Sequence, residues 1–286
     1  MPRAAPAAIT DRLPPQALFV LGATSQYVGA ALAVLLFASV PAAGVAWLRV
    51  VASAAVLVAW KRPWRTAWTA ARLRLVTAFG LTLAFMNLTF YLAIDRLPLG
   101  TAVAIEFCGP IFVAALGSRT RRDVAALVLA TAGVIALADV HLAGSPDGLA
   151  LAIAAGVGWA GYVVLGHRIA ADASIRPQEG LALGMVIGAL GFAPALVWSA
   201  VPALVSPPLL AACLAVGVAS SVVPYALEQI AMRRLARARF ALLLALLPAT
   251  ATVAGAVLLG QIPTLVEAGG IALVVVASVL RSHQSP

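Results

Sequence analysis

The chain has 286 residues, of which 63% are hydrophobic and only 10% are charged, and its formal net charge is +9. A soluble domain has about 25% charged residues, so this composition excludes an ordinary water-soluble protein. We assign the positive excess to short cytoplasmic loops of a membrane protein, and we exclude nucleic acid as its partner.

The first apolar run follows Arg3 and Arg12, begins at Pro14 and continues past Phe37. A signal peptide has a shorter apolar region followed by a cleavage site, so this run is interpreted as a retained first crossing. Further along, no Asp, Glu, Lys or Arg occurs between Gly180 and Leu227. One crossing needs about 20 apolar residues, so this stretch predicts two crossings joined by a proline-rich turn.

The apolar runs between charges and Gly or Pro breaks predict an all-α polytopic membrane protein with ten transmembrane helices. They are expected at residues 16–37, 43–60, 75–95, 99–117, 123–139, 147–166, 179–199, 209–231, 239–259 and 264–281. If both termini are cytoplasmic, all of the 19 Lys and Arg residues except Arg49 and Arg96 fall on the cytoplasmic side. This asymmetry is typical of inner loops and supports the predicted count and orientation.

The two halves of the chain resemble each other. The segment LPLGTAVAIEFCGP begins at Leu97 and LARARFALLLALLP begins at Leu235, and each ends in a proline. With five crossings in 1–140 and five in 141–286, the second repeat must enter the membrane upside down. Such inverted repeats are common in secondary transporters, whose substrate site lies near the midplane between the halves. A duplication without a transport role is the alternative.

The motifs argue against an enzyme. The sequence has no Walker-type loop, GxSxG or HExxH motif. Cys108 and Cys213 lie in apolar runs without metal-ligand spacing and are expected to be small core residues. We therefore predict no catalytic residue, no metal and no cofactor.

Glu106 is the first of three charged residues predicted inside the membrane, where charge is costly and usually functional. It lies about seven residues, or about 10 Å, from the outer end of its helix. Pro110 should loosen the preceding turn and leave carbonyl groups facing a cavity. A carboxyl group there can bind a substrate ammonium or carry a proton. A structural ion pair with Arg49 is the alternative, and the two are compatible.

Arg49 could hold a substrate carboxylate in a bidentate way, or could act structurally. Glu228 is a second candidate for proton coupling, because it shares one helical face with Ser221 and Tyr225 near a break expected at Pro224. Its alternative role is to extend toward the arginines that follow it in the chain.

Five uncharged polar or aromatic residues complete the predicted substrate site, and Tyr225 is one of them. Asn87 and Tyr91 lie one turn apart on the third helix and offer hydrogen bonds to a zwitterion. Gln26 offers the same from the first helix, and Trp159 could line the cavity from the sixth. Asn and Gln side chains also bind helices together, and buried aromatic rings more often serve packing.

Four segments carry a family resemblance: GVAWLRV around Arg49, FMNLTFYLAIDRLPLGTAVAIEFCGP at 85–110, GVGWAGYVVLGHR at 156–168 and VVPYALEQIAMRRL at 222–235. The chain resembles the drug/metabolite transporter superfamily with EamA-type repeats, and within it the threonine/homoserine exporters of bacterial inner membranes. The resemblance implies a multi-pass inner-membrane protein that exports small neutral amino acids by alternating access. Without an ATP-binding motif, the proton gradient is the expected energy source.

Several alternatives stay open at this point. Relatives of this architecture also export other metabolites, and an aromatic cavity with one carboxylate would suit cationic drugs. The expected partners are a small amino-acid substrate and the lipid bilayer, with a homodimer as an open alternative. The chain also departs from the family pattern, because many members carry Gly-Glu at the end of the ninth helix, where this chain has Gln261. A charge role or a contact at that helix end is therefore in doubt.

Overall fold

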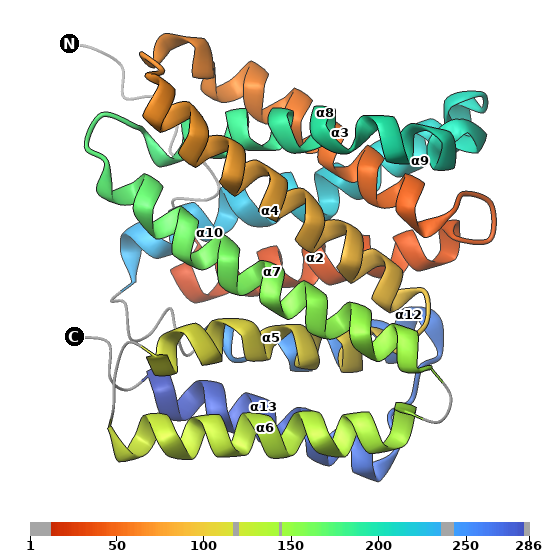
Figure 1. Cartoon of the computed structure of the whole chain (residues 1–286). Coiled ribbons are helices and arrows are strands. Elements are labelled where there is room, and N and C mark those ends of the chain that lie inside the picture. Colours follow the sequence, from red (N-terminus) through yellow and green to blue (C-terminus); the bar gives the residue numbers. More distant parts are fainter. Residues whose placement is uncertain (1–12, 117–119, 143–144, 236–242, 283–286) are drawn as a thin grey trace.

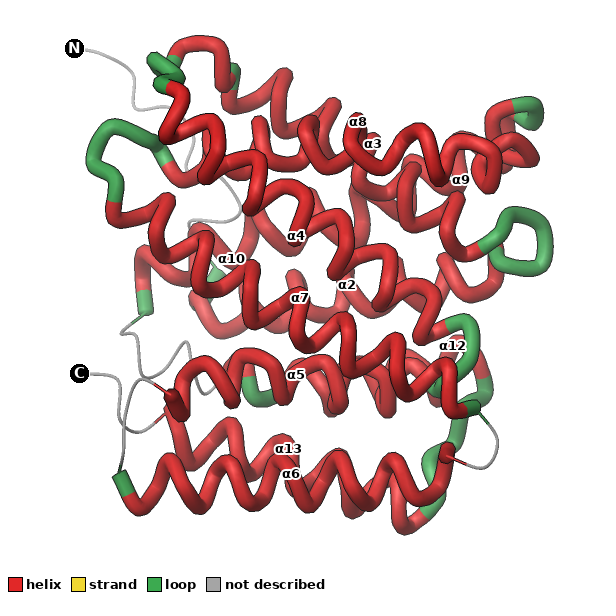
Figure 2. Tube along the Cα trace, in the orientation of Figure 1, coloured by secondary structure: helices red, strands yellow, loops and turns green. Residues whose placement is uncertain are grey.

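The computed structural model describes residues 13–116, 120–142, 145–235 and 243–282. Within these residues every regular element is helical and no strand occurs (Figure 2). Part of the predicted inner turn from Arg233 to Arg239 and the start of the ninth predicted helix lie outside the described residues.

The helices follow one another closely along the chain. They are α2 (Pro15–Leu36), α3 (Ala42–Lys61), the short η1 (Pro63–Arg65), α4 (Ala70–Ile94), α5 (Leu99–Leu116), α6 (Arg121–Leu142), α7 (Pro146–Ala171), α8 (Pro177–Leu204), α9 (Pro207–Gly217), η2 (Val218–Val222), α10 (Val223–Arg234), α12 (Leu247–Leu259) and α13 (Leu265–Ser282). Six of the described helical spans are long and apolar enough to cross a membrane. The prediction of an all-α, multi-pass membrane protein is therefore confirmed.

The prolines interrupt the helices less than the sequence suggested. Helix α8 was expected to end near residue 199, but it continues through Pro194 and Pro202 to Leu204. Within a membrane bundle, neighbouring helices can compensate the hydrogen bond that a proline removes. The chain turns only at Ser206, whose extended backbone precedes Pro207 at the start of α9.

Pro224 does not break its helix either. Helices α9 and α10 are joined by the π-helical turn η2, which ends two residues before Pro224. Pro224 has no backbone N–H to donate, and the π turn lies just before it, so the helix continues without that hydrogen bond. Such single π turns are frequent at functional sites.

The two halves of the chain are interleaved. Helix α3 packs against α8, and α4 packs against both α7 and α8. Helix α2 packs against α10 and α12, α5 packs against α7 and α12, and α6 pairs with α13 (Figure 1).

Small residues allow these helices to approach closely. A Cβ atom on Gly184 would lie 2.9 Å from the Phe79 ring, and one on Gly188 would lie 2.6 Å from the Gly80 carbonyl oxygen. At the crossing of α5 and α7, a Cβ atom on Gly156 would lie 3.1 Å from the backbone oxygen of Glu106. The carbonyl group that Pro110 leaves without its usual donor therefore faces α7 and not a cavity.

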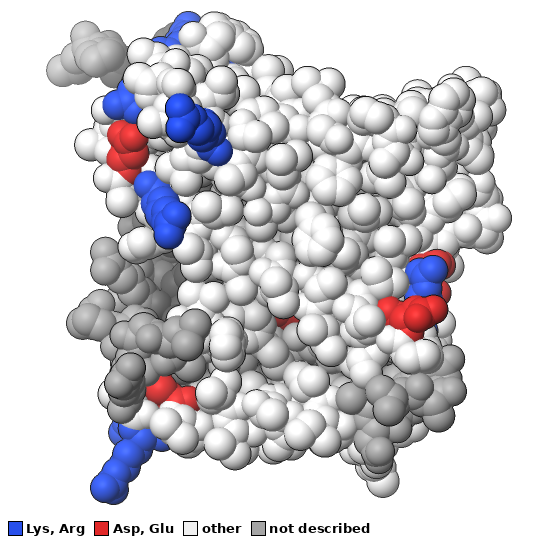
Figure 3. Space-filling model, in the orientation of Figure 1, with Lys and Arg blue, Asp and Glu red and all other residues white. Residues whose placement is uncertain are grey.

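The charged residues gather at the two ends of the bundle, with a broad uncharged surface between them (Figure 3). At one end, Arg96 pairs with Asp95. At the opposite end, Arg72 forms an ion pair of 3.2 Å with Asp172 and so joins the two halves. The backbone N–H of Ser174, together with Arg72, lowers the pKa of Asp172, so this carboxylate stays charged. The orientation of these ends across the membrane stays a prediction.

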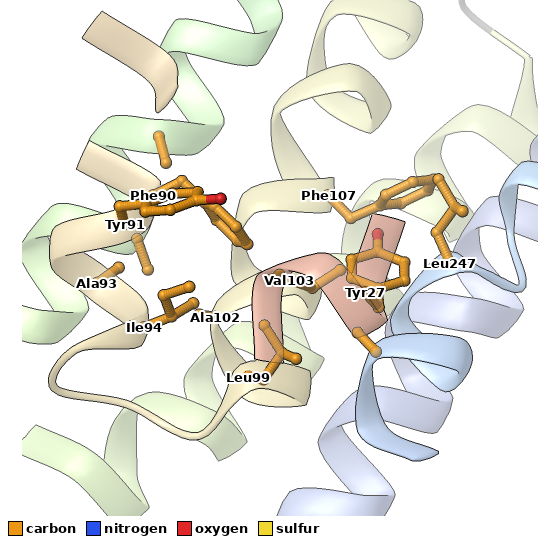
Figure 4. Packing of buried hydrophobic residues seen from close by; sticks show 14 of the residues in the cluster. Tyr27, Phe90, Tyr91, Ala93, Ile94, Leu99, Ala102, Val103, Phe107 and Leu247 are labelled. Atoms are coloured by element: carbon orange, nitrogen blue, oxygen red, sulfur yellow. The ribbon is translucent and has the colours of Figure 1, made fainter. Parts of the chain in front are cut away.

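A tightly packed apolar layer, which we call the seal, lies between the centre of the bundle and the Arg96 end. Its side chains are at most 2% exposed: Val40, Tyr91, Ile94, Leu97, Leu99 and Val103. Tyr91 packs beside Phe90, close to the end of α4 and the start of α5 (Figure 4). All six side chains belong to the main apolar core of the bundle.

Candidate functional site

A cavity of about 340 Å³ lies in the middle of the bundle and is lined by residues from both halves of the chain. Ligand pockets usually measure about 300–1,000 Å³, so this one suits a small molecule. Seven of the eight predicted site residues line it: Gln26, Arg49, Asn87, Glu106, Trp159, Tyr225 and Glu228. Along α4 and α5, the residues that line the cavity lie on the side of the seal away from Arg96.

Arg49 is held by the π-helical turn of the other half. Its Nε donates to the Ser221 hydroxyl at 2.9 Å, and Nη2 donates to the Ser220 carbonyl at 3.0 Å. Its guanidinium carbon lies 5.1 Å from the centre of the Tyr91 ring, a cation–π contact. A guanidinium has five N–H donors, so these two bonds orient it and leave donors free toward the cavity.

Glu106 faces the same cavity and is only 8% exposed. Its carboxyl group forms no hydrogen bond and no ion pair within 4.0 Å with any residue that the structure describes. The structural ion pair with Arg49, considered above as an alternative, is therefore not formed. A buried acidic group without a protein partner is costly, so its position calls for a partner from outside the chain.

The amide side chains differ in how free they are. Asn87 is 6% exposed, and its Nδ2 donates to the Leu83 carbonyl at 2.8 Å. Its amide oxygen stays available to the cavity. Gln26 also lines the cavity, one position before Tyr27 on α2. Both residues can therefore offer polar contacts to a ligand.

Glu228 lines the cavity from α10, beyond the π-helical turn. Tyr27 and Tyr162 line the same cavity. Tyr225 lines the cavity one helical turn earlier. The cavity thus has two acidic groups, one from each half of the chain.

Aromatic rings form much of the remaining wall. The Trp159 ring meets the Phe107 ring edge to face, with 5.1 Å between the ring centres. The Tyr162 ring lies 5.2 Å from that of Phe79. These contacts hold the rings in place, so the apolar part of the cavity is preformed.

Tyr91 is the one predicted site residue that does not line the cavity. It is completely buried in the seal, and its hydroxyl is the only fully enclosed side-chain polar atom of the described residues without a hydrogen-bond partner. The ring instead supports the Arg49 guanidinium. Its neighbours Phe37 and Phe90 lie on other sides of the ring.

Tyr27 was missed in the sequence. It is 2% exposed and lines the cavity, with its hydroxyl directed toward Phe107 and Leu247 (Figure 4). No residue that the structure describes forms a hydrogen bond with this hydroxyl. Its position beside Gln26 could have suggested it. Neighbouring residues of a helix point about 100° apart, however, so the sequence alone does not indicate that both face the cavity.

The comparisons with known proteins agree with this geometry. A model of the EamA-like transporter family matches residues 147–282. The threonine/homoserine exporter RhtA of Salmonella typhimurium (strain SL1344) is 36% identical over 275 residues, which cover 94% of this chain and 92% of that protein. RhtA of Escherichia coli (strain K12) is 36% identical over 253 residues, or 87% of this chain and 85% of that protein. The chain belongs to the EamA-like transporter family.

A solved structure shows the same fold. A protein crystal structure shares 21% identity with this chain and superposes with a TM-score of 0.59, over 93% of this chain and 95% of that one. The EamA-like assignment and the six apolar helices together make this chain a multi-pass membrane transporter.

The structure shows which contact Gln261 makes at the position where the chain departs from the family pattern. The backbone N–H of Leu99, at the start of α5, donates to the Gln261 Oε1 atom at 2.9 Å. A Glu side chain at this place would offer the same type of acceptor. Gln261 therefore keeps a contact between the end of α12 and the start of α5 without a charge.

Proposed function

We propose that this EamA-like protein is a secondary active exporter of small neutral amino acids, threonine and homoserine in particular, across the bacterial inner membrane. Its relatives of 36% identity are threonine/homoserine exporters, and they match nearly the full length of this chain.

One observation carries the proposal: a guanidinium and a carboxyl group that are not paired with each other face one small internal cavity. An α-amino acid carries a carboxylate and an ammonium on the same carbon atom. Arg49, oriented by Ser220 and Ser221, would bind the carboxylate with its remaining donors. Glu106, which has no partner of its own among the described residues, would bind the ammonium.

The helix contacts support two inverted repeats and alternating access. If α2 to α6 are exchanged in order with α7, α8, α9–α10, α12 and α13, each main contact becomes another contact that exists. The α4–α7 contact becomes α2–α10, the α5–α7 contact becomes α2–α12, and α3–α8 becomes itself. A bundle with this internal symmetry can close at either end around one central site.

The proton gradient is the proposed energy source. Glu106 and Glu228 are both carboxyl groups on the cavity, one in each half, so a proton could occupy one while substrate occupies the other. In this mechanism a proton enters as the amino acid leaves. Both termini would be cytoplasmic, with the seal toward the outside and the cavity open to the cytoplasm.

Export of cationic drugs is the second candidate, favoured by the aromatic wall and the two carboxyl groups. Arg49 counts against it, because its positive charge is not neutralised by Glu106 and would repel a cation. The two candidates therefore differ in whether Arg49 attracts or repels the substrate.

The test uses the purified protein in proteoliposomes loaded with radiolabelled threonine, with and without an imposed pH gradient. We expect threonine efflux to accelerate when protons can flow inward, and unlabelled homoserine to compete while lipophilic cations do not. An efflux rate that is the same with and without the pH gradient would refute proton coupling. Competition by lipophilic cations, without competition by amino acids, would replace the first candidate by the second.

A further inference from the structure

Tyr27 is a polar residue of the cavity that the proposed binding of an amino-acid backbone does not use. It is only 2% exposed, and no described residue forms a hydrogen bond with its hydroxyl. A buried hydroxyl without a partner gains a full hydrogen bond from a ligand that can reach it, and this hydroxyl lies on the cavity.

The other hydroxyl groups on the cavity are in different situations. Ser220 donates to the Val216 carbonyl at 2.6 Å, and Ser221 accepts from Arg49. The Tyr27 hydroxyl has no hydrogen bond with any described residue, and it points toward Phe107, which follows Glu106 on α5 (Figure 4). Tyr27 is therefore a free hydroxyl on the same cavity as the groups proposed to hold the amino-acid backbone.

On one side, the surroundings of this hydroxyl are apolar. It points toward Phe107 and Leu247, which also line the cavity (Figure 4). In such surroundings a hydrogen bond to a ligand is strong, while a ligand without a polar group would leave the hydroxyl unpaired. A site built in this way selects ligands that supply the missing partner.

We propose that Tyr27 recognises the side-chain hydroxyl of the transported amino acid and thereby selects hydroxy amino acids over their apolar isosteres. The inference rests on the proposed function, since it needs an amino acid whose backbone is held by Arg49 and Glu106. A tyrosine hydroxyl has one donor and two acceptor lone pairs, so it can pair with either threonine or homoserine.

The experiment compares threonine with valine, which has the same shape and a methyl group in place of the hydroxyl. Each amino acid is transported by proteoliposomes that contain the wild type or Tyr27→Phe, which keeps the ring and removes only the hydroxyl. The wild type should prefer threonine by about 5- to 100-fold, which is the effect of leaving one buried hydroxyl unpaired. In Tyr27→Phe this preference should fall to near one, through slower threonine transport and equal or faster valine transport.

Thr89→Val is the matched control, because Thr89 is 6% exposed and its hydroxyl bonds only to carbonyl groups of its own helix. It removes a buried hydroxyl outside the cavity and should keep the threonine preference. Thermal unfolding of both variants verifies that they are folded.

Three outcomes contradict the inference. An unchanged threonine preference in Tyr27→Phe would show that another group recognises the side-chain hydroxyl of the substrate. An equal loss for threonine and valine would show a structural role for Tyr27. If the wild type transports neither amino acid, the proposed function itself fails, and that result is distinguishable because it precedes any comparison of variants.

Discussion

The seal and the cavity are both buried inside the bundle, but they are built from different kinds of side chain. The seal consists of apolar side chains that are at most 2% exposed, with the Tyr91 hydroxyl as its single enclosed and unpaired polar atom among the described residues. The cavity, immediately beside it, contains Glu106 and Tyr27, which are nearly as buried and have polar groups directed into open space.

The difference shows where binding energy is available. A polar group that is paired within the protein gains little from a ligand, whereas a buried group without a partner gains a full hydrogen bond. The seal has only the Tyr91 hydroxyl as an unpaired polar group, so it has almost no group with which a ligand could form a hydrogen bond. The polar groups of the cavity are unpaired within the protein, so a zwitterion that enters the cavity can form hydrogen bonds with them in place of water.

Removing a seal side chain should have the largest effect on stability. Leu99→Ala empties a site that is completely buried. Because lipid is as apolar as leucine, the loss is mainly that of packing, so we expect the lower part of the usual range, about 2–3 kcal/mol. Thermal unfolding in detergent measures it. Leu265→Ala is the control, because Leu265 is 93% exposed. An equal effect at both positions would show that the seal is not specially packed.

Arg49→Lys should affect the cavity and leave the seal intact. Lysine keeps the charge but cannot hold both Ser221 and the Ser220 carbonyl while it also clamps a carboxylate. We expect threonine affinity to fall about tenfold, which corresponds to roughly 1.4 kcal/mol. Competition binding measures this change. Arg96→Lys, at an exposed ion pair outside the cavity, is the control. Unchanged affinity in Arg49→Lys would remove Arg49 from substrate binding.

Tyr91→Phe should have the smallest effect. The change removes a hydroxyl that has no partner and keeps the ring beneath Arg49. We expect the free energy of unfolding to stay the same or to rise by up to about 1 kcal/mol. A clear loss of stability in a melting experiment would indicate that this hydroxyl has a partner after all, and the contrast between the seal and the cavity would weaken.

Much of the fold could be predicted because its signals are compositional. Long uncharged runs and the distribution of Lys and Arg predicted the helices and the membrane environment. The helix ends were harder to predict, because Pro202 lies inside α8 whereas Pro207 begins α9. Both are prolines in apolar sequence, and only packing by neighbouring helices decides which one is tolerated.

The site could be predicted in part for a similar reason. Charges inside a membrane are conspicuous, so Arg49, Glu106 and Glu228 were all identified and all line one cavity. Their pairing was less predictable, because Arg49 bonds to a π-helical turn that no local sequence pattern announces. The sequence could not show that Tyr27 lines the cavity and Tyr91 does not, because this depends on which face of each helix packs against its neighbours.

The central claim is that an unpaired carboxyl group in the cavity binds the substrate ammonium. The most direct test is equilibrium binding of radiolabelled threonine to purified Glu106→Gln, with Asp95→Asn as a control that removes an exposed carboxylate at the end of α4. We predict that Asp95→Asn binds like the wild type and that Glu106→Gln, although folded, loses saturable binding. Wild-type binding by Glu106→Gln would contradict the account.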